Sequence, residues 1–278
     1  MNQKLRLAKL KLRRFWYLVK WFIQFKMNKI QSYQNMEEMK NNSDFKPLIL
    51  VPHADDEWIG NSQILRKKNA TVYYFQFLGN NYNETNKQVR LSELKNLQKE
   101  INFDLVVSSS YDEYSDLERL ISTDNFNEIY IPFPIDWHEE HIKVNTIFQS
   151  ILSQLENRIK LYFYHISVPF PSNIKGSFIT LTQKELTYKS EIFSRVYQSQ
   201  YNTPISRLNY QARLNAKGKK IYACENYAEL SFEEWTDLLK FVEENYSTKI
   251  KPLIHYIDDL ALIREKSNQV YLDWKLNK

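Results

Sequence analysis

The chain has 278 residues, of which 43% are hydrophobic and 15% aromatic, a composition typical of globular proteins and not of disordered ones. A single cysteine, Cys224, excludes an internal disulfide and a zinc site built from several cysteines. Only four glycines are present, and none of them are spaced like the glycine-rich loops that bind dinucleotides or nucleotide phosphates.

The formal net charge of +5 is concentrated near the N-terminus. Residues 1–29 contain nine lysines and arginines, and the first acidic residue is Glu37. The rest of the chain has 29 basic against 33 acidic residues, which gives it a net charge of −4. A body of this charge is not typical of nucleic-acid-binding proteins, so we expect no nucleic-acid partner.

Residues 1–34 are predicted to contain a basic amphipathic helix, which extends over residues 4–30. Its apolar positions recur with helical spacing: Leu5, Leu12, Trp16, Val19 and Ile23. The most apolar stretch, residues 15–25, is too short to cross a bilayer, and no small-residue site for signal-peptide cleavage is visible. Two interpretations stay open: contact with an anionic membrane surface, or packing on the domain or a second subunit. We expect a cytoplasmic protein, which under the first interpretation would also contact the inner face of the membrane.

Residues 35–46 are polar and are predicted to be a linker, and residues 47–278 are predicted to form one domain with a helical C-terminal extension. Strand and helix patterns alternate along the first half of this domain. Strands are expected at residues 48–51, 71–78, 105–107, 128–131 and 160–168, and helices at 58–68, 86–101, 114–122, 142–159, 184–200, 232–246 and from about 257. This order predicts an α/β fold, with a Rossmann-like, mostly parallel sheet and flanking helices.

Two short clusters of histidines and carboxylates each follow a predicted strand. The first is Pro52-His53-Ala54-Asp55-Asp56-Glu57, and the second is Asp136-Trp137-His138-Glu139-Glu140-His141. Open α/β folds bind their ligands at the carboxyl edge of the sheet, where parallel strands end. The pattern therefore favours a functional site built from both clusters.

These residue types are the ones that a catalytic metal site needs, since zinc usually takes three ligands from His and Asp or Glu and one water. His53 and Asp56 can converge on one ion if the chain turns after the strand, and His141 could be the third ligand. Asp55 would then lie beside the metal, placed to take a proton from the bound water. The structural alternative is that both aspartates cap a helix and that the histidines are ordinary surface residues.

The two clusters also resemble a known pair of motifs. The first is similar to the P-H-P-D-D-E motif of the PIG-L/LmbE family of zinc-dependent N-acetylglucosaminyl deacetylases, and the second to its D-x-H-x-D-H motif. The resemblance covers about residues 48–230, because it continues at Arg90-Leu91-Ser92-Glu93, residues 164–169, Lys189, Tyr197, Ser199, Gln200 and Tyr227-Ala228-Glu229.

The resemblance implies zinc bound by His53, Asp56 and His141, with Asp55 as the general base. It further implies that His138 stabilises the oxyanion or protonates the departing amine and that Arg90 helps to hold the substrate. The implied reaction hydrolyses an N-acetylated amino sugar, such as a GlcNAc-type conjugate or glycan precursor, to acetate and a free amine. A site of two histidines and one aspartate also accepts other divalent metals, including Fe²⁺.

Two positions depart from the family motifs. Ala54 replaces a proline and removes no functional group. Glu140 stands at an aspartate position that orients a histidine, and its extra methylene could reposition His138 or His141 and weaken catalysis. Neither change removes a ligand or the base, so we expect an active enzyme. Two alternatives remain: a metal-dependent amidase acting on another acylated amine, and a catalytically silent scaffold of the same fold.

Overall fold

A computed structural model of the chain describes residues 3–27, 33, 35–39, 46–78, 83–109, 114–152, 159–201 and 203–277. Within these residues the strands form one eight-stranded sheet with the order β1-β7-β8-β6-β5-β2-β3-β4. The strands are β1 (Met36–Glu38), β2 (Pro47–Val51), β3 (Thr71–Tyr74), β4 (Asp104–Val107), β5 (Glu128–Pro132), β6 (Lys160–Tyr164), β7 (Gly176–Leu181) and β8 (Ala223–Ala228).

Five neighbouring strands, from β4 to β6, run parallel. The chain starts this part of the sheet at β2, builds outward through β3 to β4, and then returns to the other side of β2 with β5 and β6. The point between β2 and β5 is therefore the place where the order of strands reverses, which is where open α/β sheets bind ligands. The expected α/β fold with a Rossmann-like, mostly parallel sheet is confirmed.

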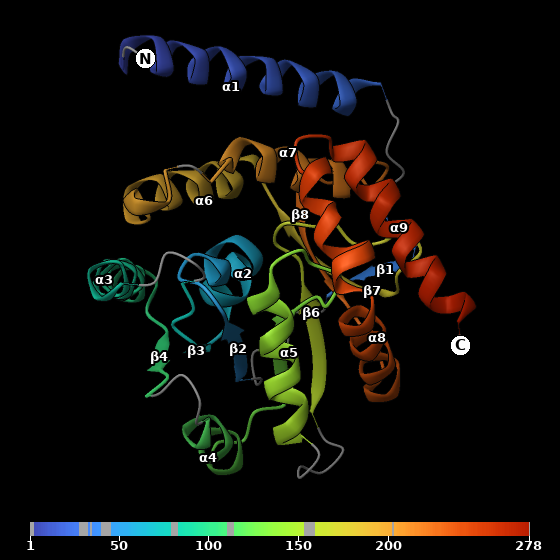
Figure 1. The fold of residues 1–278 in the computed structure, drawn as a ribbon. Helices are drawn as coiled ribbons and strands as arrows, with labels where there is room; N and C mark the ends of the chain where they lie inside the picture. The colour runs from blue at the N-terminus through green and yellow to red at the C-terminus, as the bar shows by residue number, and fades with distance from the viewer. Residues whose placement is uncertain are drawn as a thin grey trace.

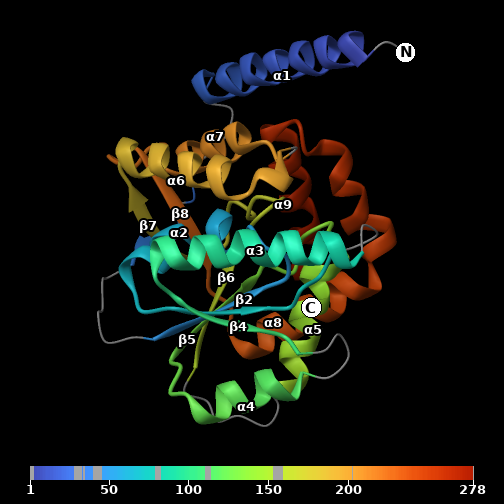
Figure 2. The same cartoon turned by 90° about the vertical axis from the view of Figure 1, so that its left-hand side faces the viewer.

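Helices cover both faces of the sheet (Figures 1 and 2). The described helices are α1 (Gln3–Lys26), α2 (Asp56–Lys67), α3 (Glu84–Ile101), α4 (Ser115–Thr123), α5 (Glu139–Leu152), α6 (Gln183–Val196), α7 (Ile205–Asn215), α8 (Phe232–Glu244) and α9 (Leu260–Leu276), with shorter helical turns η2 (Gln198–Gln200), η3 (Tyr246–Ile250) and η4 (Lys251–Tyr256). In β2, Leu48 and Leu50 join the core under α4, α5, α8 and α9, whereas Ile49 and Val51 join the core under α2, α3 and α6. Burial on both faces explains why this strand is apolar throughout.

The later part of the sheet was not predicted. Strands β7 and β8 pair antiparallel to each other, and β8 is also antiparallel to β6. Strand β8 is buried at every position although it contains Glu225 and Asn226, so it lacks the apolar run that marked the other strands. Helix α7 was also missed. Within the expected linker, Met36–Glu38 pair with β7 as the edge strand β1.

Some element ends differ from the prediction. Strand β3 ends at Tyr74 instead of residue 78, and Gln76 adopts a positive φ of 62° that takes the chain out of the strand conformation. Helix α5 is described to Leu152; of the rest of the expected helix, residues 153–158 lie outside the described residues and Ile159 is not helical. The expected N-terminal helix is present as α1, and residues 28–30 likewise lie outside the described part.

Helix α1 lies across one end of the molecule, over α6 and α7 (Figure 1). Its Trp21 side chain is buried against Leu214 of α7 and Leu260 of α9. The Trp21 indole N–H donates to the carbonyl oxygen of Asp258 at 3.2 Å, and Lys20 forms a 2.8 Å ion pair with Asp259. Among the described helices, none is both long enough and apolar enough to span a membrane.

Candidate metal site

The first cluster forms a tight turn between β2 and α2. Strand β2 ends at Val51, and α2 begins at Asp56. Asp55 joins them with φ 136° and ψ −24°, a backbone conformation that non-glycine residues rarely adopt and that costs on the order of 1–3 kcal/mol. The amide N–H groups of Trp58 and Ile59 donate to the Asp55 carbonyl, so the first turn of α2 stabilises this conformation. Strain of this kind is typical of functional sites.

The second cluster lies at the end of the neighbouring strand. Strand β5 ends at Pro132, and α5 begins at Glu139. His141 therefore falls in the first turn of α5, where its amide N–H donates to the His138 carbonyl at 3.2 Å. Because β2 and β5 are adjacent and parallel, both clusters meet at the switch point of the sheet.

Three side chains from the two clusters converge on one point. His53 Nδ1 lies 3.1 Å from Asp56 Oδ2 and 3.3 Å from His141 Nε2, and His141 Nε2 lies 3.3 Å from Asp56 Oδ2. Ligands held tetrahedrally at the usual zinc distances of about 2.0–2.2 Å are separated by about 3.3–3.6 Å. Asp56 and His141 are buried and His53 is partly buried. The donor set and its spacing fit a divalent metal.

The charges around this point favour a cation. Burial alone would lower the pKa of His141, but Asp136 and Asp56 raise it to about 10. Burial would likewise lower the pKa of His53, but hydrogen bonds with Asp56 and Glu140 raise it to about 9. Without a metal, the carboxylates are thus balanced by protons on the imidazoles. A bound metal ion would replace those protons.

Each of the two histidines also contacts a carboxylate with its other ring nitrogen. His53 Nε2 lies 2.6 Å from Glu140 Oε2, and His141 Nδ1 lies 3.2 Å from Asp136 Oδ2. Carboxylates in these positions orient an imidazole and set which nitrogen is free to bind metal. From the sequence, Glu140 was expected to act on His138 or His141, whereas the structure places it against His53. Asp136 was assigned no role from the sequence, although it is the first residue of the second motif.

Asp55 and His138 lie next to the three converging side chains. Burial, with the charges of Asp56 and Glu57, raises the pKa of the Asp55 carboxyl well above its usual value. The His138 ring stacks on Trp137 with a centroid separation of 3.6 Å and lies 4.9 Å from the His141 ring. Burial, followed by the charge of His141, lowers the pKa of His138 to about 4.

Arg90 lies on α3, near Asp55. Its charge opposes the rise in the Asp55 pKa, and its buried Nη1 has no hydrogen-bond partner among the described residues. The nearest carboxylate is Glu93 Oε2, 4.0 Å from Nη1. A buried guanidinium nitrogen with an unused hydrogen is suited to binding a substrate oxygen.

Tyr197, which follows α6, and Gln200 of η2 support the turn that carries Asp55, although no function was assigned to them from the sequence. The Tyr197 hydroxyl donates to Glu57 Oε1, and Glu57 Oε2 accepts from the Asp55 amide at 3.1 Å. Gln200 Nε2 donates to the Ala54 carbonyl at 3.1 Å. Their place in the family-like Y-x-S-Q pattern was the available signal. It now has a physical basis, because these contacts fix the strained turn.

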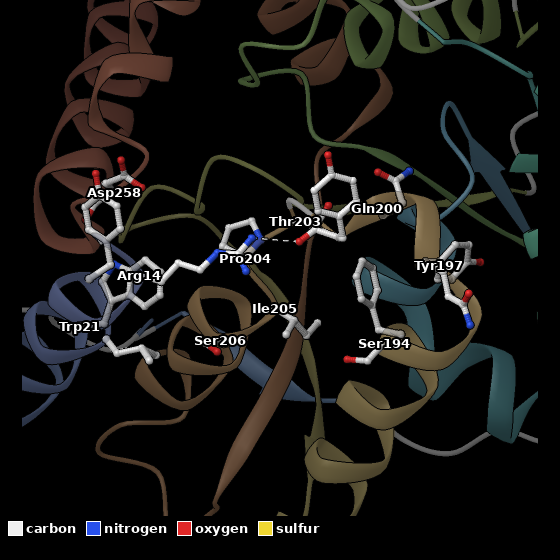
Figure 3. Close-up of a pocket in the computed structure, with 15 residues that line it drawn as sticks. Arg14, Trp21, Ser194, Tyr197, Gln200, Thr203, Pro204, Ile205, Ser206 and Asp258 are labelled. Carbon is white, nitrogen blue, oxygen red and sulfur yellow. Dashed lines mark hydrogen bonds between the residues drawn. The ribbon is translucent and has the colours of Figure 1, made fainter. Parts of the chain in front are cut away.

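A groove of about 610 Å³ lies beside this turn, between α1, α6, η2 and the start of α7. Figure 3 shows Arg14 and Trp21 on one side of it and Tyr197 and Gln200 on the other. Arg14 Nη2 donates to the Tyr201 carbonyl at 3.2 Å across it. Tyr197 and Gln200 therefore line the groove and also contact the turn that carries Asp55. The converging histidines and aspartate do not line the groove.

Comparison with solved structures places the fold among those of deacetylases. The crystal structure of the antimicrobial A40926 pseudoaglycone deacetylase Dbv21 matches with a TM-score of 0.51 and 11% sequence identity, over 69% of this chain and 99% of that one. The zinc-inhibited form of teicoplanin deacetylase Orf2 matches with a TM-score of 0.50 and 12% identity, over 66% and 97% of the two chains. At these identities the likeness defines the fold alone. No protein-family model and no curated protein matches the chain.

Proposed function

We propose that this chain is a metal-dependent hydrolase that removes the acetyl group from an N-acetylated amino sugar. The observation that carries the proposal is the convergence of His53 Nδ1, Asp56 Oδ2 and His141 Nε2, with the buried Asp55 beside them. Support also comes from the shared fold, since Dbv21 and Orf2 are both deacetylases.

His53, Asp56 and His141 would hold the ion, and their donor set suits Zn²⁺ and also Fe²⁺. When bound there, the ion supplies Lewis acidity that lowers the pKa of water and polarises the acetamide carbonyl. Glu140 and Asp136 orient the two imidazoles from behind, so the ligand atoms are held in place before the substrate arrives.

Asp55 acts as the base in this scheme. A carboxylate oxygen of Asp55 takes a proton from water while the water oxygen attacks the carbonyl carbon of the acetamide. The His138 ring N–H donates to the oxyanion of the tetrahedral intermediate, and Arg90 binds the substrate through its unused Nη1 hydrogens. Asp55 then returns the proton to the nitrogen as the C–N bond breaks, which gives acetate and a free amine.

The test is metal content together with acetate release. We expect about one metal ion per chain in the wild-type protein and in Asp55→Asn, and none in a variant that combines Asp56→Ala with His141→Ala. Acetate release from a panel of N-acetylated amino sugars should be lost in Asp55→Asn, which keeps the metal and nearly the same shape but removes the base.

Three outcomes would contradict the proposal. A protein that binds no metal, even after incubation with zinc, would make the cluster a structural feature and favour the silent scaffold. Bound metal with hydrolysis of other acylated amines, but not of acetamido sugars, would favour the broader amidase. Acetate release that survives Asp55→Asn would remove Asp55 from the role of base.

A further inference from the structure

Helix α1 has two apolar faces, and the domain uses only one of them. Tyr17, Trp21 and Phe25 are four residues apart and form one stripe of the helix. This inner face packs on Leu214, Leu260 and neighbouring side chains of α7 and α9. The domain-packing interpretation from the sequence is therefore realised, but by a different stripe from the one predicted.

The opposite stripe of α1 is exposed to solvent. Seven of the fourteen large hydrophobic side chains exposed in the described chain belong to residues 12–27: Leu12, Phe15, Trp16, Leu18, Phe22, Ile23 and Met27. Trp16 is 61% exposed and Phe15 is 58% exposed. Scattered exposed hydrophobic residues are ordinary, but a contiguous patch of them marks an interaction surface. We call the stripe formed by Leu12, Phe15, Trp16, Phe22, Ile23 and Met27 the outer face.

The charge of this helix identifies the kind of partner. Residues 1–29 carry nine basic residues and no acidic residue. Lys20 pairs with Asp259 and Arg14 donates to the Tyr201 carbonyl, so part of this charge is used within the molecule, and the helix has no acidic residue of its own to balance the rest. Basic residues next to exposed tryptophan and phenylalanine are typical of helices that lie in the headgroup layer of anionic membranes.

The position of α1 suits a flat partner. The helix has 24 residues, which corresponds to a length of about 36 Å. It lies at the outermost end of the molecule in both views, so that a planar surface can meet its whole length without touching the rest of the domain (Figures 1 and 2). An extended, one-sided contact of this kind is what a bilayer surface offers.

We propose that the outer face of α1 docks this protein on an anionic lipid surface. The apolar side chains of the outer face enter the boundary between headgroups and acyl chains, and the net positive charge of this part of the chain is attracted to lipid phosphates. The inner face stays on α7 and α9 and connects the domain to the membrane. This docking is independent of the hydrolase activity proposed above, and its test uses no substrate.

The experiment measures co-sedimentation of the full chain with vesicles of phosphatidylcholine alone and with vesicles of equal parts phosphatidylcholine and phosphatidylglycerol. We expect binding to the anionic vesicles only, weakened by added salt because salt screens the charges. A variant combining Phe15→Ala, Trp16→Ala and Phe22→Ala should bind at least about tenfold more weakly, because each of these side chains loses its burial in the lipid.

The matched control removes three exposed apolar side chains elsewhere, with Phe232→Ala, Leu272→Ala and Leu276→Ala. It should bind as the wild-type chain does, and thermal unfolding should show that both triple variants fold. Equal binding to neutral vesicles, or unchanged binding of the α1 variant, would overturn the proposal. A dimer in light scattering that the α1 variant converts to a monomer, without vesicle binding, would instead assign the outer face to a second copy of the chain.

Discussion

Replacing Glu140 with alanine should weaken metal binding by about 10- to 100-fold, the range found when a carboxylate behind a metal-bound histidine is removed. The reason is the 2.6 Å contact between Glu140 Oε2 and His53 Nε2, which fixes the His53 ring and leaves Nδ1 free for the metal. The change in affinity corresponds to about 1.4–2.7 kcal/mol. Glu140 is partly buried at the start of α5, so its loss should leave the fold intact.

Competition with a chelator of known affinity measures the dissociation constant in each variant. Glu140→Gln retains an oxygen that accepts from His53 and should recover most of the affinity, whereas Glu140→Asp should not, because its carboxylate falls short. Glu139→Ala is the matched control, since it removes the same charge from the same helical turn at an exposed position. If Glu140→Ala bound metal as tightly as the wild-type protein, or if Glu139→Ala lost as much affinity, the orienting role of Glu140 would be refuted.

Three further predictions concern stability. Lys189→Met should lower the free energy of unfolding, measured in urea, by about 3–5 kcal/mol, because it leaves the buried Glu225 carboxylate without the ammonium that now lies 2.5 Å away. A change below about 1 kcal/mol would mean that Glu225 finds another partner. Gly176→Ala should destabilise the folded protein by about 3 kcal/mol or more, since the added Cβ would lie 2.1 Å from the Tyr227 carbonyl oxygen and force β7 away from β8. If the variant were as stable as the wild-type protein, the pairing of β7 with β8 would be able to shift. Burial, followed by two nearby arginines, lowers the pKa of His165 to about 3. The unfolded chain therefore takes up a proton below about pH 6.5 that the folded chain does not, so stability falls by roughly 2 kcal/mol between about pH 7 and pH 5, and His165→Gln should remove this part of the slope in pH-dependent unfolding.

The sequence predicts the parallel half of the sheet well and the antiparallel half poorly, for a physical reason. Strand β2 is buried on both faces and is apolar throughout, so its composition marks it as a strand. Strand β8 is equally buried, but Glu225 lies in it because Lys189 and backbone N–H groups of Ser62 and Gln63 satisfy its carboxylate. Partners this distant in the chain are set by tertiary packing, which a local pattern does not report.

The same limit applies to the candidate site and to α1. Residue types and spacing are enough to predict which side chains can bind a metal, because the donor atoms are a property of the residue type itself. Which carboxylate contacts which histidine depends on how the β2–α2 turn faces the start of α5. For α1, helical spacing predicts an apolar stripe through Leu12 and Trp16, but not that Trp21 on the other side is the residue that the domain buries.

Glu140, the main departure from the family-like motif, gains a specific explanation from this arrangement. The two carboxylates that contact the histidines from the side away from the metal point, Asp136 and Glu140, both belong to the second cluster. Asp136 contacts His141 of the same cluster, whereas Glu140 contacts His53 of the first cluster. An aspartate at position 140 would be shorter by one C–C bond of about 1.5 Å, which would stretch the 2.6 Å contact to about 4 Å, beyond hydrogen-bond range, unless the backbone moved. The extra methylene is therefore what allows this chain to connect the β2–α2 turn to α5 through a hydrogen bond. On this argument, glutamate at position 140 is matched to the position of His53, and an aspartate introduced alone would impair the site.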